Sequence, residues 1–288
     1  MTTLTGLAPA KVNLFLHVGP VQPDGYHPLA SLVAFADVGD RLTVERGDRL
    51  SLTVQGRFGS ALAGEPDNLV LRALRALGQA AGIGEPPLRV TLDKVLPIAA
   101  GLGGGSSDAG AALRLARDLL GLPFDETALA DIAGTLGADG AMCVHARAAW
   151  AGGRGDHLEF EPRLPPLPAV LINPGVPSPT GAVYRAYDEG VAAGADRPAP
   201  PVIWDVPMVI AWLAEGRNDL EAPAVRNQPA IGEALSAARD LPAVRLVRMS
   251  GSGATAFALF ESAVDASNAA KKLSNEKPDW WVSSTILR

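Results

Sequence analysis

The sequence is poor in the features of secreted and membrane-bound proteins. Cys143 is the only cysteine among the 288 residues, so no disulfide can form within the chain and nothing indicates an oxidising compartment. No apolar run approaches the roughly 18 uninterrupted residues of a membrane-spanning helix. The first apolar stretch, Val12–Val18, is interrupted by Asn13 and His17, and no basic region precedes it, which is not the pattern of a signal peptide. We therefore expect a soluble, cytoplasmic protein.

Charged residues are also scarce, and acidic residues outnumber basic ones. They make up 19% of the chain, with a formal net charge of -6. Surfaces that bind nucleic acid or anionic membranes need clustered Lys and Arg to displace counterions, so neither partner is expected. Hydrophobic residues make up 48% of the chain, which is ample for a folded globular protein. Because 288 residues exceed the length at which a single hydrophobic core usually stops growing, the chain is expected to form two modest domains.

Alternation of apolar and other residues predicts that the first quarter of the chain is mostly sheet. Strands are expected at Leu7–Val18, Leu29–Ala36, Arg41–Arg46 and Leu50–Gln55. Lys11 and Asn13 then share one face of the first strand. The turn residues Gly47 and Asp48 predict a tight hairpin between the last two strands.

Helical spacing and capping residues predict the elements that follow. Helices are expected from a cap at Asp67 or Asn68 to Gly82, from near Ser106 to Gly121 and over roughly Asp125–Leu136, with a strand at Leu88–Leu92. The proline-rich stretch Glu161–Pro168 predicts a stiff linker, which divides the chain into domains 1–160 and 161–288.

The second domain shows a split βαβ pattern. Strands are expected at Ala169–Asn173, Ala243–Met249, Ala254–Phe260 and Trp281–Leu287. Helices are expected between them, from Pro229 and after Phe260, together with a loop-rich helical insertion through Val191–Pro201. The two halves together predict an α+β fold.

A glycine-rich loop precedes the second predicted helix. The segment Gly101–Ser107 holds four glycines and two serines directly before the helix. Glycine lets a backbone approach an anion closely, and the free N–H groups at a helix start favour negative charge, so this loop is suited to phosphate. It has no Lys before its serine pair and lacks the dinucleotide spacing, so Walker and Rossmann sites are disfavoured. The alternative is a flexible loop capped by Ser106.

Three segments together resemble the motifs of the GHMP kinases, in the form of their cytidyl-erythritol branch. The segment Leu96–Asp108 is similar to the ATP loop of the family, and Pro9–Leu16 followed by Asp24-Gly25-Tyr26-His27 resembles its first motif. The segment Met249–Thr255 resembles the third motif, so the resemblance extends over nearly the whole chain. The region 186–227 carries no part of it.

This resemblance implies the fold and the activity. It implies an ATP-binding N-terminal domain like domain 2 of ribosomal protein S5, a ferredoxin-like substrate-binding C-terminal domain, and an active site between them. It further implies that ATP phosphorylates the 2-hydroxyl of 4-diphosphocytidyl-2-C-methyl-D-erythritol in the non-mevalonate route to isoprenoid precursors. Mg²⁺ is expected to enter with ATP, held mainly by phosphate oxygens and water. A monomer or weak homodimer is expected.

The resemblance also implies two catalytic residues. Asp139 matches the catalytic aspartate and is expected to act as the general base, while Lys11 is expected to stabilise it and the developing negative charge. Taken alone, a Gly-Ala-Asp triplet such as the one ending at Asp139 is more often a surface turn or helix cap. The alternative for Lys11 is a snorkelling lysine on an edge strand. The family usually continues with Pro and an aromatic residue after this Asp, whereas Gly140–Cys143 follow here.

Binding residues are carried over in the same way. Expected ATP contacts are Pro97, Ala99, Gly101, Leu102, Gly103, Gly104, Gly105, Ser106, Ser107, Asn68 and Lys94. Expected substrate contacts are Asn13, Tyr26, His27, Thr180 and Tyr184, with the aromatic rings stacking on the cytosine. Asn68 read alone is simply a good helix cap. His145 and His157 lack partners at metal-ligand spacing, so no protein metal site is predicted.

Two alternatives remain at this stage. Another GHMP kinase, such as a homoserine or mevalonate kinase, would keep the glycine loop but lack the Asp24–His27 element and the second aromatic residue, Tyr184. A non-catalytic nucleotide-binding or scaffold protein is suggested only by the unusual Gly140–Cys143 stretch, and the presence of Lys11 and Asp139 opposes it.

Overall fold

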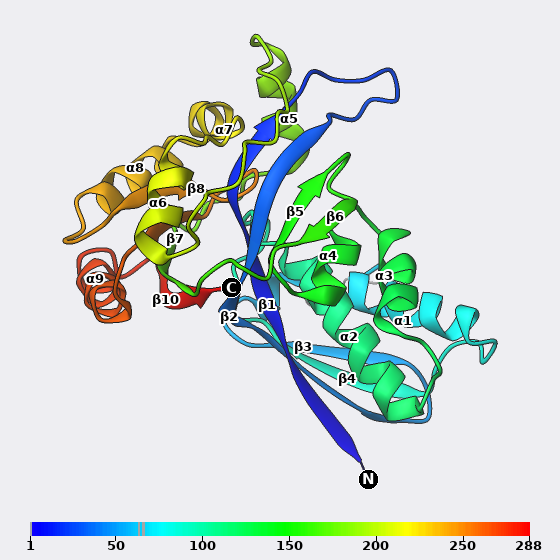
Figure 1. Cartoon of the computed structure of the whole chain (residues 1–288). Coiled ribbons are helices and arrows are strands. Elements are labelled where there is room, and N and C mark those ends of the chain that lie inside the picture. The colour runs from blue at the N-terminus through cyan, green and yellow to red at the C-terminus, as the bar shows by residue number, and fades with distance from the viewer. Residues whose placement is uncertain (1, 63, 65–66) are drawn as a thin grey trace. The chain divides into compact units, whose positions relative to one another are not determined.

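The computed structural model describes residues 2–62, 64 and 67–288. Contacts divide the chain into two compact units, each built from separated segments (Figure 1). The first unit comprises the chain up to Ala10, Gly39–Ile98 and Gly103–Ala146, and the second comprises Lys11–Val38, Ala99–Leu102 and Arg147–Arg288. Two long strands, β1 (Thr3–Val18) and β2 (Leu29–Arg46), contribute residues to both units. Among the described residues, no helix is long and apolar enough to cross a membrane.

The first unit packs helices against a small sheet. Its remaining elements are β3 (Ser51–Gln55), the 3-10 helix η1 (Gly59–Leu62), α1 (Leu69–Ala80), β4 (Leu88–Asp93), α2 (Gly104–Leu120), α3 (Glu126–Gly134) and α4 (Gly140–His145). Asn68 caps α1 and Asp125 caps α3, as their sequence positions predict. The helix α2 begins two residues before the expected Ser106 and ends, as predicted, before Gly121.

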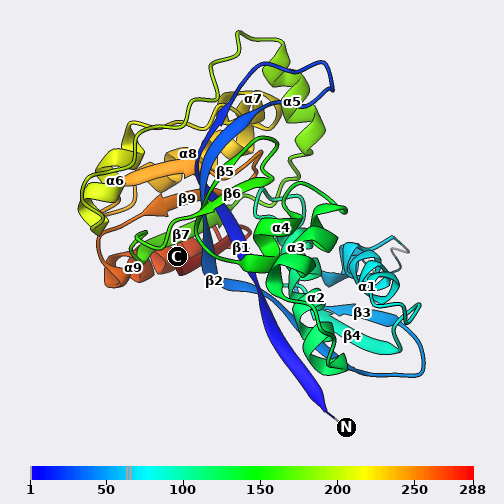
Figure 2. The ribbon, with the colours of Figure 1, turned by 45° about the vertical axis from the view of Figure 1, so that its right-hand side comes forward.

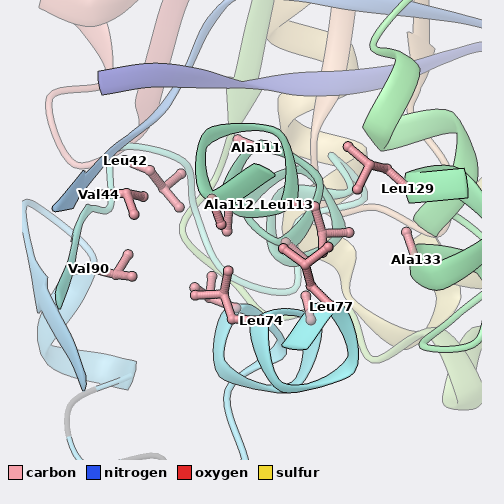
Figure 3. Close-up of a cluster of buried hydrophobic side chains, with 14 of the residues drawn as sticks. Leu42, Val44, Leu74, Leu77, Val90, Ala111, Ala112, Leu113, Leu129 and Ala133 are labelled. Carbon is pink, nitrogen blue, oxygen red and sulfur yellow. The ribbon is translucent and has the colours of Figure 1, made fainter. Parts of the chain in front are cut away.

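The core of the first unit is built around α2 (Figure 3). Its face presents mostly small side chains, such as Ala112, between Leu42 and Val90 of the sheet and Leu74 of α1. Small residues let backbones approach closely, and a Cβ atom at Gly110 of α2 would meet the carbonyl oxygen of Cys143 at 2.7 Å. This close approach fixes α4 against α2.

One predicted pairing in this unit is wrong. The strands on either side of Gly47 and Asp48 do not form a hairpin, because β4 lies between β2 and β3. β4 pairs antiparallel with β2 and parallel with β3. Since alternate residues of β4 are fully buried and those of β3 are partly exposed, the more apolar strand takes the central position. The predicted strands 29–36 and 41–46 are a single strand, β2.

The second unit contains the ferredoxin-like part. Its strands are β5 (Ala149–Gly152), β6 (His157–Phe160), β7 (Leu167–Asn173), β8 (Leu246–Met249), β9 (Ala256–Leu259) and β10 (Trp281–Leu287). Its helices are α5 (Thr180–Asp188), α6 (Val206–Ala214), α7 (Glu221–Asn227), α8 (Pro229–Arg239) and α9 (Ala263–Glu276). The segment 191–205 between α5 and α6 contains no helix. The helical insertion expected through Val191–Pro201 is therefore a loop over these residues, and helix begins only after them.

The order of these strands confirms the split βαβ prediction. The sheet runs β10-β7-β9-β8, and each neighbouring pair is antiparallel. Figure 2 shows α8 and α9 beside this sheet, and their side chains share one core with Val170 and Ile172 of β7. Both helices therefore cover the same sheet face.

Candidate active site

Three sequence motifs meet at β1 within the second unit. The backbone N–H of Lys11 donates to the carbonyl of Leu102 at 2.8 Å. The N–H of Asn13 donates to the hydroxyl of Ser250 at 3.2 Å, and that hydroxyl donates to the carbonyl of Gly101 at 2.9 Å. The start of the chain, the first half of the glycine loop and the third motif therefore form one hydrogen-bonded cluster.

Side-chain hydrogen bonds fix the ammonium group of Lys11 in this cluster. Lys11 is only 6% exposed, and its Nζ donates to Oδ1 of Asn13 at 2.9 Å. Nδ2 of Asn13 donates to Oγ of Ser31 at 2.8 Å, and this hydroxyl donates to the carbonyl of Phe15 at 2.5 Å. Because each group has a directed partner, the lysine and the amide are pre-oriented. Sequence reasoning missed Ser31, whose only signal is a hydroxyl within the apolar run 29–36.

The glycine loop depends on backbone conformations that only glycine adopts easily. Gly101 has φ +73°, and a Cβ atom there would lie 2.3 Å from the carbonyl oxygen of Ser250. Gly103 has φ +62° and forms the N-cap of α2 without a side-chain hydrogen bond. Ser106 is therefore not the cap. Pro97 is buried before the loop, and Ala99 is exposed within it.

Asn218 supports the third motif from the region 186–227, which contains none of the three motifs recognised in the sequence. Its Nδ2 donates to the carbonyls of Met249 and Gly251, both at 2.8 Å, and its Oδ1 accepts from the N–H of Leu220 at 2.9 Å. This buried amide therefore fixes the backbone next to Ser250. Nothing local in the sequence identifies it.

The second half of the glycine loop opens α2 in the first unit. Gly104, Gly105, Ser106 and Ser107 form the first turn, where helix N–H groups have no intrahelical acceptor. Ser107 is buried, and its hydroxyl donates to Sγ of Cys143 at 3.4 Å. This turn presents the N–H groups and the positive dipole end that suit a phosphate.

Lys94 lies below this turn and is fully enclosed. It is 3% exposed, and its ammonium donates to Oδ2 of Asp40 at 2.5 Å and to Oδ2 of Asp108 at 2.7 Å. Burial lowers the pKa of Lys94, but the two carboxylates outweigh it and the net pKa is raised. A Cβ atom at Gly104 would lie 3.1 Å from its Nζ. Asn68, the other expected nucleotide contact outside the loop, caps α1 by accepting from Val70 at 3.0 Å.

These contacts give a test at Gly104. We expect Gly104→Val to weaken ATP binding by roughly tenfold or more, because the added side chain displaces the Lys94 ammonium and crowds the backbone at the phosphate. Calorimetric titration with an ATP analogue measures the affinity. Gly134→Ala is the matched control, since a Cβ atom there meets nothing within 4 Å. Unchanged affinity in Gly104→Val would remove this glycine from the nucleotide site.

Asp139 begins α4, a short helix that the sequence analysis did not predict. It adopts φ −78° and ψ −5° at the N-cap of α4, without a side-chain capping bond. A Cβ atom on the next residue, Gly140, would lie 2.1 Å from the carbonyl oxygen of Ala133. The departure from the usual family sequence after Asp139 therefore has a packing reason: α4 approaches α3 too closely for any side chain at this position.

The predicted cytidine-binding residues gather at α5 in the second unit. The rings of His27 and Tyr184 lie 4.9 Å apart with an interplanar angle of 36°. Nε2 of His27 pairs with Oδ1 of Asp188 at 2.7 Å, a partner that sequence reasoning missed. Thr180 begins α5, and its hydroxyl lies 2.9 Å from Oγ of Ser252.

Tyr26 has a different neighbour. The guanidinium of Arg154 stacks over its ring at 4.0 Å and forms an ion pair with Asp24. The pKa of Asp24 lies below its usual value, mainly because its carboxylate accepts a hydrogen bond from the Tyr26 N–H and, secondly, because it accepts one from Arg154. Tyr26 remains 53% exposed, so part of its ring is available to a ligand.

The second unit also contains a pocket of about 430 Å³. Its lining includes Leu29, Ser31, Trp150, Glu159 and Arg197. Arg197 stacks over Trp150 at 4.1 Å and donates to Glu159 at 2.6 Å. Ser31 connects the pocket to Asn13 and therefore to Lys11.

Family models match both halves of the chain. Residues 68–147 match the N-terminal domain of the GHMP kinases, and residues 208–279 match their C-terminal domain. The chain therefore belongs to the GHMP kinases, whose members use ATP. The predicted α+β, two-domain GHMP kinase fold is confirmed.

Within this family the similarity is to one kind of kinase. The 4-diphosphocytidyl-2-C-methyl-D-erythritol kinase of Caulobacter vibrioides (strain NA1000 / CB15N) is 54% identical over 282 residues, which cover 97% of both chains. A crystal structure of 4-(cytidine 5'-diphospho)-2C-methyl-D-erythritol kinase has a TM-score of 0.76 and 37% identity, covering 99% of both chains. The homoserine kinase from Cytophaga hutchinsonii has a TM-score of 0.65 but 17% identity, covering 99% of this chain and 94% of its own, and shows the fold alone.

Proposed function

We propose that this protein transfers the γ-phosphoryl group of ATP to the 2-hydroxyl of 4-diphosphocytidyl-2-C-methyl-D-erythritol, in the non-mevalonate route to isoprenoid precursors. The 54% identity over 97% of both chains supports the substrate. The observation that carries the chemistry is the cluster in which Lys11, Asn13 and Ser250 join three motifs. We infer a cytoplasmic enzyme that acts as a monomer or weak homodimer.

Phosphoryl transfer needs positioning, charge stabilisation and an acceptor for the hydroxyl proton. Asp139 accepts the proton of the 2-hydroxyl. Lys11, oriented by Asn13, supplies positive charge for the oxygen as it loses the proton. The first turn of α2 and the loop before it hold the phosphates. Mg²⁺ bound together with ATP would neutralise phosphate charge, with phosphate oxygens and water as its main ligands.

The cytidine is bound by the rings at α5. His27, held by Asp188 and in contact with the tilted ring of Tyr184, offers a ring edge for hydrogen bonds, and Tyr26 offers an exposed face. Asn13 and Thr180 bind the part of the substrate near the reacting hydroxyl. In the proposed division into an ATP-binding domain, 1–160, and a substrate-binding domain, 161–288, the first part of the sequence also supplies Asn13, Tyr26 and His27 to the substrate, because Lys11–Val38 belongs to the second unit.

Substrate choice tests this assignment. We expect kcat/KM for the cytidyl substrate to exceed that for unconjugated methylerythritol phosphate by roughly 10²–10³-fold, because each stacked base contact contributes about 1–3 kcal/mol. ADP release with a panel of alcohols measures this preference. Tyr184→Ala should reduce the ratio of the two kcat/KM values by about tenfold or more, with little change in KM for ATP.

The other possible results with this panel of alcohols would support other activities for this protein. Equal turnover with and without the cytidine would contradict the substrate assignment. Phosphorylation of homoserine or mevalonate would support another GHMP activity. Absence of turnover with every alcohol, despite ATP binding, would support a non-catalytic nucleotide-binding protein.

A further inference from the structure

A buried group of three charged residues lies beneath the first turn of α2. Asp40, Lys94 and Asp108 are 0%, 3% and 2% exposed. Both carboxylates accept from the same ammonium, at 2.5 and 2.7 Å. With all three ionised, the group carries a net charge of −1 in a site from which water is excluded. Buried charge without full compensation is costly, so the group favours taking up one proton.

The hydrogen bonds indicate which carboxyl group takes the proton. Asp40 accepts from the N–H groups of Val95 and Leu96 at 2.6 and 2.8 Å, as well as from Lys94, and these donors stabilise its ionised form. Asp108 accepts only from Lys94 among the described residues, and its buried Oδ1 has no partner there. Burial is the largest influence on the pKa of Asp108 and raises it. The positive charge of Lys94 lowers this pKa and the negative charge of Asp40 raises it, and the net result is a pKa of about 7.

The position of this group connects it to the nucleotide. Asp108 belongs to the helix that begins at Gly104, and a Cβ atom at Gly104 would lie 3.1 Å from Nζ of Lys94 and 3.7 Å from Oδ2 of Asp40. Phosphate bound at this helix start adds negative charge beside the group. That charge makes ionisation of a second carboxyl group more costly.

We propose that Asp40, Lys94 and Asp108 make nucleotide binding proton-linked, with Asp108 taking up a proton when phosphate binds at the first turn of α2. Asp40 and Asp108 are then positioning residues that hold Lys94 beneath the loop and set the charge there. This inference rests on the proposed ATP site and goes beyond it. It predicts weaker nucleotide binding as the pH rises through about 7.

Four charged groups on the elements around α2 have partners other than Asp108. Glu126 of α3 and His145 of α4 face each other at 3.3 Å. Arg114 of α2 donates to the carbonyls of Cys143 and Val144, and Arg75 of α1 pairs with Glu85 at 2.8 Å. Asp139, at the start of α4, is the remaining carboxyl group that the proposed function places near the phosphates.

Calorimetric titration with Mg²⁺ and a non-hydrolysable ATP analogue tests the proposal, in buffers of different ionisation enthalpy. For wild type we expect proton uptake near pH 7. A pKa change of about one unit on binding would make the dissociation constant about tenfold weaker at about pH 8.5 than at about pH 6. Asp108→Asn should bind equally at about pH 6 but about tenfold more tightly than wild type at about pH 8.5. The ligand's own titration is common to both proteins.

Controls separate charge from structure. Asp118→Asn, an exposed position on the same helix, should retain the wild-type pH dependence. Equal loss of affinity at both pH values in Asp108→Asn would mean that the carboxyl group is only a hydrogen-bond partner, and would overturn the proposal. If Asp108→Asn does not fold, the proton uptake of wild type decides. Uptake beyond that of the free ligand supports the proposal, and the absence of such uptake overturns it. Failure of the wild-type protein to bind the ATP analogue at any pH would instead contradict the proposed function.

Discussion

Replacing Asp139 with Asn is expected to lower kcat by about 10²–10⁴-fold, because the amide retains size and hydrogen bonding but cannot accept the hydroxyl proton. This corresponds to roughly 3–5 kcal/mol at the transition state. ATP affinity should stay within about threefold of wild type, since the nucleotide is held by the glycine loop and α2. Steady-state kinetics and calorimetric titration measure the two effects separately.

The contrast between rate and affinity is what identifies a base. Asp131→Asn, an exposed position on α3, is the matched control and should leave both quantities unchanged. Near-normal turnover in Asp139→Asn would mean that this residue only starts α4. Loss of folding or of ATP binding would mean that its role is structural and that another group accepts the proton.

Replacing Gly101 with Ala is expected to destabilise the protein and to disrupt the loop that holds ATP. The new Cβ atom would lie 2.3 Å from the Ser250 carbonyl oxygen, and the residue has φ +73°. A left-handed conformation costs a non-glycine residue about 1–2 kcal/mol, and the forced backbone shift about 1–3 kcal/mol more. A decrease of several degrees in Tm and a loss of ATP affinity should follow, measured by thermal unfolding and calorimetry.

Gly121→Ala separates the two causes. Gly121 has φ +66°, but a Cβ atom there meets nothing within 4 Å. This variant should therefore show only the conformational cost and retain ATP binding. Equal destabilisation of both variants would show that contact with the third motif contributes nothing at Gly101.

The sequence predicted the elements whose signals are local. The helix starts at Asn68 and Asp125, the glycine turn before α2 and the final strand all depend on residues close to one another in the chain. Motif spacing also identified Lys11, Asn13 and the three segments that hydrogen bonds join at β1. These local and motif signals were sufficient for the fold class and the family.

Prediction was less successful where a residue's partner is distant in sequence. Gly47 and Asp48 do mark a turn, but a turn does not determine which strand lies beside which, and β4 takes the place next to β2. Asn218 and Asp188 were missed for the same reason, because their partners lie 31 and 161 residues away. Long-range pairing depends on competing burial, which short patterns do not contain.

By itself, the sequence determined the helices and strands that have local signals, the family motifs and the candidate base and lysine. Only the tertiary structure decided that Lys94 is enclosed by Asp40 and Asp108, which lie 54 and 14 residues away from it in the chain. The same three residues on a surface would be an ordinary solvated cluster. Because water is excluded around them, their charges compete for one proton, and that competition makes Asp108 a group that titrates near neutral pH.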